Sequence, residues 1–450
     1  MNKNGKELIF KVLENNEVNN IPWVPFAGVH AGKLKGYTAI EVLKDSDKLL
    51  ESLLEVNKIY QPDGQPVMFD LQIEAEILGC ELNWEEDSPP TVISHPLADT
   101  QEIPDKIPEK DEGRIPLVVE TMEMMKEKVG TDTALYGLIC GPFTLASHLR
   151  GTNLYMDMVT DPDYVKKILK YTVNIVKKMS EYYIEAGMDV IAAVDPMVSQ
   201  ISPDHFEEFL TPVYSELFEY IGEQGAYSSF FVCGDATKNI EKMCQTSPDS
   251  ISVDENVSLP EAKKITDKYD IVIGGNIPLT TVMLFGNQQD NMKWVIDLLD
   301  NIDHNNLIIA PGCDMPYEVP VENTIAVEQA VHKPEQTREM IKNYEKEEID
   351  IEIELPDYDN LEKPLVEVFT LDSDTCAACT YMMAAANEAK NEFGDDIEVE
   401  EYKYTSKENI ARMNRVGVKN LPSIYVNGEL KFSSTVPNRE ELFEVIRECL

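Results

Sequence analysis

The sequence predicts two α/β units: a (β/α)8 barrel over residues 1–344 and a small α/β domain over residues 365–450. Three observations lead to this prediction. Short apolar runs alternate with helix-length amphipathic segments in the first 344 residues, which is typical of a parallel sheet built from βα units. Residues 345–364 then form an acidic stretch with little to bury, and a second set of strand and helix patterns follows it.

The barrel prediction depends on the number of apolar runs and on the length of chain that contains them. Eight runs in about 340 residues match a closed eight-stranded barrel with insertions better than an open doubly wound sheet. In chain order the expected strands are 21–27, 66–69, 134–140, 189–194, 229–233, 250–253, 271–275 and 306–310. Residues 84–114 lack apolar periodicity and are expected to form a long loop after the second strand.

The pattern changes between Glu345 and Lys363, a stretch with nine acidic and two basic residues that contains Pro356. We expect a charged, extended linker there. After the linker, the segments LVEVFTL, IEVEEYKYT, SIYVNGE and LKFSST are expected strands, and residues 380–393, 407–416 and 439–450 are expected helices. These elements make up a domain of about 86 residues, within the usual size range.

The charge of the chain argues against two classes of partner. Its 450 residues include 82 acidic and 39 basic residues, a formal charge of −43, which repels nucleic-acid phosphates and anionic lipid heads. No segment has the roughly 20 apolar residues that span a bilayer, and the N-terminal stretch lacks a signal peptide's apolar centre. We therefore expect a cytoplasmic protein that binds neither nucleic acid nor membranes. The acid excess fits a surface suited to high intracellular salt, or charge that prevents aggregation.

Polar residues follow nearly every expected strand, and in a barrel of this kind the chemistry lies where strands end and βα loops begin. Among them we expect Asp70, Asp195 and Asp254 to be catalytic. We expect Gly141, Pro142 and Asn276 to bind a cofactor. Other residues that follow the expected strands include His30, Cys233, Asp235, Glu255, Cys313 and Asp314.

Two cysteines are candidates for a metal site. Eight cysteines in 450 residues are too few for a disulfide scaffold, so we expect them to be reduced. Cys233 and Cys313 are 80 residues apart but end the fifth and eighth expected strands, so both side chains can reach one point above the core. Two thiolates with a histidine or carboxylate make a zinc site with an open position. The alternative is that both are simply packed, as free cysteines often are.

Several segments, in this order, resemble the uroporphyrinogen decarboxylase superfamily: MFDLQIEAEILGCELNW, CGPFTLASHLRG, GMDVIAAVDP with ISPDHFEEFLTP, VCGDATKNI, SISVDE, GGNIPL and APGCD. The resemblance covers residues 1–344 and is greatest to the methylcobamide:coenzyme M methyltransferase branch. In the decarboxylases an Arg-rich first loop binds the substrate carboxylates, whereas residues 26–32 contain no arginine, so decarboxylation of a polycarboxylate lacks its countercharge. Asp70 matches the decarboxylase aspartate, but both branches have an aspartate there.

The methyltransferase branch implies a zinc ion held by a His-x-Cys motif on the fifth strand and a cysteine after the eighth. Cys233 and Cys313 match the two cysteines, but Phe231 stands at the histidine position and cannot bind zinc. His30, after the first strand, is our first candidate for the missing ligand. The carboxylate alternatives are Asp235, Asp254 and Glu255. A loop histidine without any ligand role stays open as the other interpretation of His30.

The resemblance implies methyl transfer to sulfur in an anaerobic one-carbon pathway. Zinc would lower the pKa of a thiol, and the thiolate would attack the methyl group of a methyl-cobalt(III) corrinoid, leaving cobalt(I). The corrinoid arrives on a separate small protein in such systems, and this chain has no Asp-x-His-x-x-Gly cobalamin motif. We therefore expect a corrinoid protein and a small, coenzyme M-like thiol as partners, with zinc and methylcobamide as cofactors.

The C-terminal unit carries a Cys-x-x-Cys motif. Cys376-Ala377-Ala378-Cys379 is expected to open a helix, where free N–H groups and the helix dipole favour a thiolate. Leu421-Pro422 precedes a strand, and this proline can adopt a cis bond beside the dithiol. In β-α-β-α-β-β-α order, these features resemble thioredoxin and glutaredoxin over residues 365–450. We expect Cys376 and Cys379 to be catalytic as a redox dithiol; a structural zinc pair and chance cysteines are the alternatives.

Two roles are open for this dithiol. It keeps the barrel cysteines reduced or reduces a disulfide form of the thiol substrate, or Cys376 itself accepts the methyl group. Two functions compete with methyl transfer: a thiol–disulfide oxidoreductase that uses both cysteine pairs, and a corrinoid-protein-binding module without chemistry. Phe231 discriminates, because a replacement zinc ligand favours methyl transfer, whereas an apolar mouth around two close cysteines favours the oxidoreductase.

Overall fold

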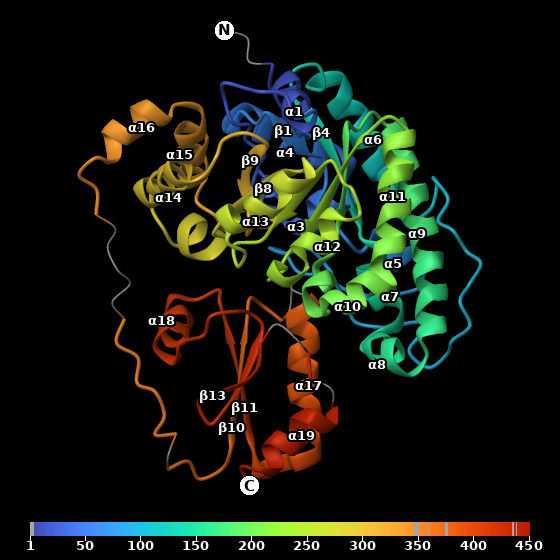
Figure 1. Cartoon of the computed structure of the whole chain (residues 1–450), viewed down its shortest axis with the longest axis vertical. Helices are drawn as coiled ribbons and strands as arrows, with labels where there is room; N and C mark the ends of the chain where they lie inside the picture. The colour runs from blue at the N-terminus through green and yellow to red at the C-terminus, as the bar shows by residue number, and fades with distance from the viewer. Residues whose placement is uncertain (1–3, 346–350, 359, 374–376, 434–435, 438) are drawn as a thin grey trace. The chain divides into compact units, whose positions relative to one another are not determined.

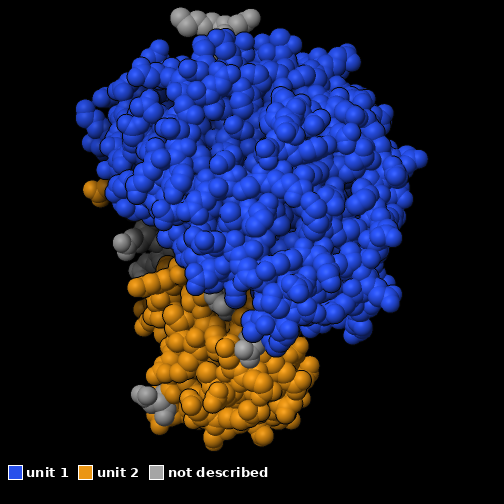
Figure 2. Space-filling view, turned by 45° about the vertical axis from the view of Figure 1, so that its right-hand side comes forward, with its two compact units in different colours: residues 1–198, 202–344 blue, residues 199–201, 345–450 orange. Residues whose placement is uncertain are grey.

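The computed structural model describes residues 4–345, 351–358, 360–373, 377–433, 436–437 and 439–450. The chain divides into two compact units, shown in different colours in Figure 2. Unit 1 comprises Met1–Val198 and Ser202–Tyr344, and unit 2 comprises Ser199–Ile201 and Glu345–Leu450. Of the described residues between 345 and 364, none lies in a helix or strand. No described helix combines the length and the apolar character that crossing a membrane requires.

Unit 1 is built on one parallel sheet of strand order β1-β4-β5-β6-β7-β8-β9 among its described residues. The strands are β1 (Gly64–Pro66), β4 (Ala134–Cys140), β5 (Val190–Val194), β6 (Tyr227–Val232), β7 (Ser250–Val253), β8 (Val272–Ile277) and β9 (Leu307–Pro311). The segment at Trp23 closes the ring, because its carbonyl oxygen accepts from Asp63 N at 2.9 Å while Val24 N donates to Ile309 O at 3.0 Å. The predicted eight-stranded barrel is therefore confirmed, with the first expected strand serving as the closing bridge.

Helices surround these strands (Figure 1), with α9 and α11 on one flank of the barrel and α14 and α15 on the other. Helix starts follow ordinary capping chemistry: Thr38 and Glu41 form a capping box at α3, and Asp161 caps α9. The helices are α1 (Gly5–Leu13), α2 (His30–Lys33), α3 (Ala39–Lys44), α4 (Ser46–Tyr60), α5 (Ile73–Ile77), α6 (Ile115–Lys128), α7 (Pro142–Arg150), α8 (Asn153–Thr160), α9 (Pro162–Glu185), α10 (Pro203–His205), α11 (Thr211–Glu223), α12 (Ile240–Cys244), α13 (Leu259–Thr266), α14 (Gln288–Asn301), α15 (Val321–His332) and α16 (Pro334–Ile341).

The barrel interior is a packed core and not a pore. Side chains from β4, β5, β6, β8, β9 and the Trp23 segment meet in one buried cluster, which includes Val24, Tyr136, Leu138, Ala192, Val194, Phe231, Val272, Ile308 and Ala310. An interior cavity of only about 10 Å³ lies among them, lined in part by Ser229, Ser250 and Ser252. Cys233 and Cys313 are partly buried and pack against the same cluster, so they cover one end of the core.

The insertion after β1 differs from the predicted loop in one respect. Its start holds a short antiparallel hairpin of β2 (Leu82–Asn83) and β3 (Thr91–Val92). Two-residue strands are too short to leave a periodic pattern in the sequence, which is why they were not predicted. From residue 93 to the start of α6, the chain has no further helix or strand.

Unit 2 has a four-stranded sheet of order β11-β10-β12-β13, with β10 parallel to β11 and antiparallel to β12. One face packs a core that includes Val368, Met382, Ile424 and Phe443, and the other packs Phe369, Met413, Leu421 and Tyr425. The peptide bond between Leu421 and Pro422 is cis. The elements are β10 (Leu365–Thr370), α17 (Ala377–Phe393), β11 (Glu398–Lys403), α18 (Lys407–Val416), β12 (Ser423–Val426), β13 (Glu429–Ser433) and α19 (Arg439–Arg447).

Candidate active site at the barrel mouth

The C-terminal ends of the barrel strands bring several sequence-predicted residues to one rim, called the mouth below. Parallel strands all end on the same side of a closed barrel, so the residues that follow them share that side. Asp195, Cys233 and Asp254 directly follow β5, β6 and β7, while Cys313 comes two residues after β9. Asp70 lies four residues after β1.

Cys233 and Cys313 are joined by a disulfide bond, with their Cα atoms 5.8 Å apart. The prediction that these two cysteines are reduced was therefore wrong for this structure. The physical reason is convergence of two strand ends, which brings the Cα atoms within the range that a disulfide requires. Strands β6 and β9 are not neighbours, since β7 and β8 lie between them, so the bond connects two separated points of the mouth.

Phe231, two residues before Cys233 on β6, has no exposed surface and belongs to an aromatic group beneath the disulfide. Its ring centroid lies 4.7 Å from that of Phe26 and 5.8 Å from that of Phe69. Residues 231 and 233 point to the same side of the strand because side chains alternate along it. The position next to the two sulfur atoms is therefore apolar.

His30 is fully buried, and both of its ring nitrogens are already hydrogen-bonded. Nδ1 donates to the carbonyl oxygen of Tyr317 at 2.9 Å, so Nε2 accepts from the hydroxyl of Tyr60 at 2.7 Å. Burial lowers the pKa of His30 to about 4, which keeps the ring neutral at pH 7. In this arrangement His30 has no free ring nitrogen with which to bind a metal ion beside the two cysteines.

The implied zinc ion does not fit the residues as they stand. Two sulfur atoms bonded to each other are not thiolates, and thiolate is the form that binds zinc. Across the described part of the chain, no three His, Cys, Asp or Glu side chains are grouped so that they could hold a metal ion. The carboxylate alternatives Asp235, Asp254 and Glu255 each make other contacts: Asp235 Oδ1 accepts from Thr237 N at 3.0 Å, and those of the other two are given below.

Asp70 forms a buried ion pair with Arg114, a residue that the sequence did not single out. The carboxylate of Asp70 has no exposed surface, accepts a short hydrogen bond from Arg114 Nη1 and accepts from Gln72 N at 2.8 Å. Arg114 also donates from Nε to Glu76 at 2.8 Å, and its Cζ lies 4.9 Å from the ring centroid of Trp84. The ion pair thus ties the β1 end to the start of α6.

Asp195 is fully buried and accepts hydrogen bonds from several donors. Phe143 N donates to it at 2.9 Å, Thr144 donates from both its backbone N and its hydroxyl, and the Tyr214 hydroxyl makes a short bond. Burial raises its pKa to about 6 in spite of these bonds. Gly141 has a packing reason here, because a Cβ at this position would lie 2.3 Å from Asp195 Oδ2. Pro142 occupies the first turn of α7.

Asp254, Glu255 and Asn276 form one connected group at the ends of β7 and β8. Asp254 Oδ1 accepts from the backbone N and side-chain Nδ2 of Asn256, at 2.9 and 2.5 Å. Asn276 Nδ2 donates to the carbonyl oxygens of Asp254 and Val257 at 2.9 and 2.6 Å. Glu255 accepts a short hydrogen bond from Leu279 N. Burial, and to a smaller extent the charge of Asp254, raises the pKa of Glu255 to about 8.

Two further acids lie in this region, of which Asp314 is half-buried and Glu74 is buried. Asp314 follows Cys313 directly, its Oδ1 has no hydrogen-bond partner among the described residues, and burial raises its pKa well above the usual range. Gly28 leaves it room, since a Cβ there would lie 2.1 Å from that oxygen. Glu74, on α5, is 1% exposed, and burial raises its pKa to about 8. Sequence reasoning missed Glu74; its place four residues after Asp70 was the available signal.

In unit 2, Cys379 is buried near the start of α17, and its Sγ accepts from Leu371 N at 3.3 Å. Its motif partner Cys376 lies outside the described residues, so the predicted dithiol remains a prediction. Glu401, on β11, holds the segment that follows β10. Its carboxylate accepts hydrogen bonds from Thr370 Oγ1 at 2.5 Å and from Ser373 Oγ at 2.8 Å.

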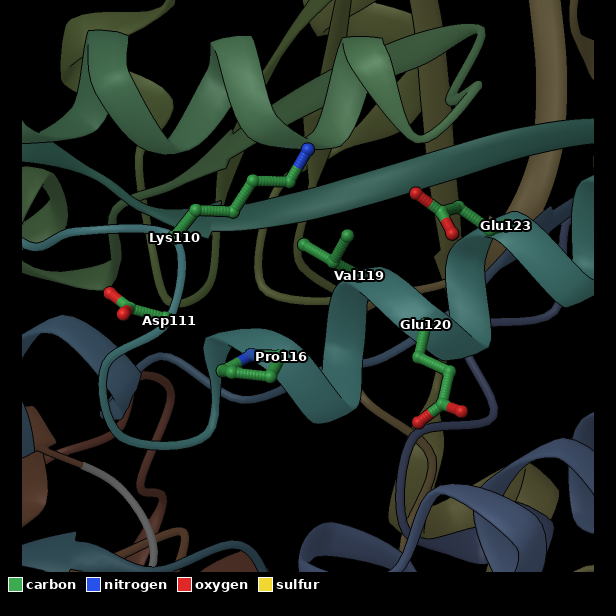
Figure 3. A pocket seen from close by; sticks show the side chains of 6 residues that line it. All are labelled: Lys110, Asp111, Pro116, Val119, Glu120 and Glu123. Atoms are coloured by element: carbon green, nitrogen blue, oxygen red, sulfur yellow. The ribbon is translucent and has the colours of Figure 1, made fainter.

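A surface hollow lies elsewhere on unit 1, along α6 and the loop before it (Figure 3). Its lining is Lys110, Asp111, Pro116, Val119, Glu120 and Glu123. The ammonium group of Lys110 pairs with Glu185 at 3.0 Å, and the hollow is open, with acidic, basic and apolar side chains in its lining. Because this lining contains no histidine or cysteine and does not include a strand end, we assign no chemistry to it.

Comparison with known proteins places both units. Residues 4–334 match the family model for uroporphyrinogen decarboxylase, and residues 365–447 match a thioredoxin domain. One relative, "Methylcobamide:CoM methyltransferase MtbA" of Methanosarcina acetivorans, is 25% identical over 327 residues, which is 71% of this chain and 94% of the relative. Another, "Uroporphyrinogen decarboxylase" of Nostoc punctiforme, is 24% identical over 285 residues, covering 62% of this chain and 80% of the relative.

A solved structure supports the fold of unit 1. A methyltransferase from Methanosarcina mazei superposes with a TM-score of 0.66 at 22% identity, covering 75% of this chain and 99% of that one. The family match spans more than half of the chain and coincides with the barrel whose strand ends form the mouth. The chain therefore belongs to the uroporphyrinogen decarboxylase family and carries a C-terminal thioredoxin domain.

Proposed function

We propose that this chain is a methyltransferase that moves a methyl group from a methylcobamide to the sulfur of a small thiol. The observation that carries the proposal is the meeting of Cys233 and Cys313 at the mouth of a barrel of this family. A relative whose sequence matches this chain over 94% of its own length is named a methylcobamide:CoM methyltransferase. This similarity supports the same class of reaction for this chain. That the acceptor is a small thiol is part of the proposal.

The reaction proposed is a displacement at carbon. The sulfur of the acceptor attacks the methyl group of a methyl-cobalt(III) corrinoid, a carbon–sulfur bond forms, and the carbon–cobalt bond breaks with both electrons left on cobalt(I). The proton of the thiol is released. The methylcobamide is a substrate carried by a separate corrinoid protein, and the mouth is then the surface to which that protein delivers it. The apolar wall of Phe26, Phe69 and Phe231 is suited to holding water away from the reacting sulfur.

Decarboxylation, the activity in the name of another relative, finds less support in the charges of unit 1. A polycarboxylate substrate needs free arginines, and only three arginines precede residue 345. Arg114 pairs with Asp70 and Glu76, and Arg150 pairs with Asp157 at 2.7 Å. Arg338 pairs with Asp300 and Glu335, both at 2.6 Å. All three guanidinium groups already have carboxylate partners.

Zinc activation of the acceptor thiol remains a prediction. The two cysteines supply sulfur ligands only in their reduced form, and Phe231 occupies the place where the resemblance implies a third ligand. We therefore attach no step of the reaction to the metal. The test compares the metal content of the reduced chain with that of a Cys233→Ser and Cys313→Ser double variant. About one zinc per chain, lost in the double variant, would support zinc binding by the two cysteines.

The C-terminal domain is proposed to supply reducing equivalents. Thiol–disulfide exchange is the usual chemistry of a Cys-x-x-Cys motif on this fold. In this proposal the domain keeps the barrel cysteines or the thiol substrate reduced. The alternative is methyl transfer to Cys376 itself. It predicts that, after exposure to a methyl donor, mass spectra show Cys376 heavier by about 14 Da, the mass of one CH2 group. A Cys379→Ser variant that retains full activity under oxidising conditions would remove the reductant role.

The central experiment measures methyl transfer anaerobically with the reduced full-length chain. Free methylcobalamin is the donor and coenzyme M the acceptor; cobalt(I) is followed by absorbance and the methylated thiol by mass spectrometry. We expect cobalt(I) and methylated thiol in equal amounts; loss of both in the Cys233→Ser variant would show that this cysteine of the mouth takes part in the reaction. Cys244→Ser, a buried cysteine on α12 away from the mouth, is the matched control and should keep the activity. Absence of methyl transfer with several small thiols would favour an oxidoreductase or a binding module.

A further inference from the structure

The disulfide at the barrel mouth joins two cysteines that are less buried than the other cysteines of unit 1. Cys233 and Cys313 are both partly exposed, whereas the other cysteines of unit 1, at positions 80, 140 and 244, are buried. Burial raises the thiol pKa of each of these three. Thiol–disulfide exchange depends on access of the attacking sulfur, so the bonded pair is the barrel's accessible sulfur site among the described residues.

The strands that carry the two cysteines are also connected by hydrogen-bonded ladders, independently of the disulfide. Strands β6 and β9 are connected through β7 and β8 by a continuous series of parallel ladders. Beneath the disulfide, Phe231 and its neighbours fill the interior without any contribution from a covalent link. A disulfide that crosses an already closed ring is free to open without leaving any strand unpaired.

The two sulfurs also have no third partner that would turn them into a metal centre. Phe231 is buried on the same side of β6 as Cys233, and His30 has both ring nitrogens occupied. Groups of three metal-binding side chains are absent from the described residues. Two cysteines that lie within bonding distance, without a third ligand, have thiol–disulfide exchange as their remaining chemistry.

We propose that Cys233 and Cys313 form a redox-active disulfide at the barrel mouth that is reduced by a dithiol. In the exchange, one thiolate of the donor attacks one sulfur of the pair, the Cys233–Cys313 bond breaks and a mixed disulfide forms. The second donor thiolate then displaces the protein sulfur. Two electrons and two protons move from the dithiol to the pair, leaving two cysteine thiols and a donor disulfide.

This site has a consequence for methyl transfer that depends on the proposed function above. In the disulfide form neither sulfur can act as a nucleophile or bind a metal. Under the proposed function, with its cysteine pair at the mouth, we expect the reduced chain to be the active form, so that reduction of the pair by two electrons precedes methyl transfer. The redox site itself stands independently, since its chemistry involves no methyl donor.

The test equilibrates the full-length chain with mixtures of oxidised and reduced dithiothreitol, quenches with iodoacetamide and resolves the cysteine peptides by mass spectrometry. We expect a linked Cys233–Cys313 peptide in oxidised mixtures and both cysteines alkylated in reduced ones, with the two changing together at one midpoint. Circular dichroism should show a folded chain throughout. In a Cys233→Ser variant, Cys313 should be alkylated to the same extent in every mixture.

Two results would overturn the proposal. One is failure of the two cysteines to form a disulfide in fully oxidised dithiothreitol, whether they are alkylated as free thiols or held reduced by a bound zinc ion. The other is a linked peptide that persists in reduced dithiothreitol until the chain unfolds, which would make the disulfide purely structural. None of these readouts uses methylcobalamin, so failure of methyl transfer with a normal redox midpoint refutes the proposed function alone.

Discussion

Replacing Asp70 by Asn tests whether this residue, predicted to be catalytic, instead stabilises the fold through its ion pair with Arg114. The Asp70 carboxylate is fully buried against Arg114, whose own side chain is 10% exposed. Asn keeps the shape and an acceptor oxygen but removes the charge. Arg114 is then left with Glu76, whose side chain is 36% exposed, as its remaining carboxylate partner.

The expected loss is large because a buried charge loses its nearest counter-charge. Breaking a buried ion pair from one side costs about 3–5 kcal/mol, and we expect about 3 kcal/mol because Glu76 continues to pair with Arg114. With an unfolding entropy of about 2.1 cal/mol/K per residue over the roughly 340 residues of unit 1, this corresponds to a Tm lower by about 4 °C.

Thermal unfolding followed by circular dichroism measures the effect. The matched control is Glu261→Gln, which breaks a pair with Lys264 in which both side chains are 68% exposed, and should shift Tm by less than about 1 °C. An Asp70→Leu and Arg114→Met double variant removes both charges and should recover most of the loss. An unchanged Tm in Asp70→Asn, or a double variant as unstable as the single one, would refute the reasoning. Activity of a stable double variant would show that Asp70 is not catalytic.

Three further predictions concern pH, redox state and metal binding. Burial raises the pKa of Glu74 from 4.5 to about 8, so the folded chain holds a proton that the unfolded chain releases. Its stabilising contribution is complete below about pH 4.5 and falls by up to about 1.4 kcal/mol per pH unit until about pH 8, a slope that Glu74→Gln should remove from melting curves. Reduction of the Cys233–Cys313 disulfide, which closes an 80-residue loop, should cost up to about 4.5 kcal/mol, or about 6 °C in Tm, with no effect of dithiothreitol on the double Ser variant. Phe231→His should destabilise unit 1 by about 2–4 kcal/mol, because it places a polar ring in a buried apolar position. The reduced His variant should bind zinc, and the control Phe231→Leu should not. Absence of zinc from the His variant would contradict a site formed by residue 231 with the two cysteines.

Much of the fold followed from periodicity and spacing alone. The apolar runs at 134–140, 189–194 and 250–253 coincide with β4, β5 and β7 to within a residue, because a fully buried parallel strand leaves a short continuous apolar pattern. The hairpin of β2 and β3 could not be predicted, since its strands are two residues long. The first expected strand became a bridge at Trp23, a role set by its two neighbours in the ring and not by its own sequence.

Site residues followed from the sequence less completely. The rule that chemistry follows strand ends selected Asp70, Asp195, Cys233, Asp254 and Cys313, and the barrel places all of them at one mouth. The partners of these residues come from distant parts of the chain and have no sequence signature: Arg114 for Asp70 and Tyr214 for Asp195. For the same reason, the engagement of His30 with Tyr60 and Tyr317 could not be foreseen.

The sequence by itself determined the two units, the acidic stretch between them and the types of residue that end each strand. These properties depend on local patterns of polarity and on spacing along the chain. Only the tertiary structure decided that Cys233 and Cys313 are bonded to each other and that His30 is turned to other partners. The physical reason is that bond formation and hydrogen bonding depend on distances between atoms far apart in the chain, and closure of the barrel sets those distances.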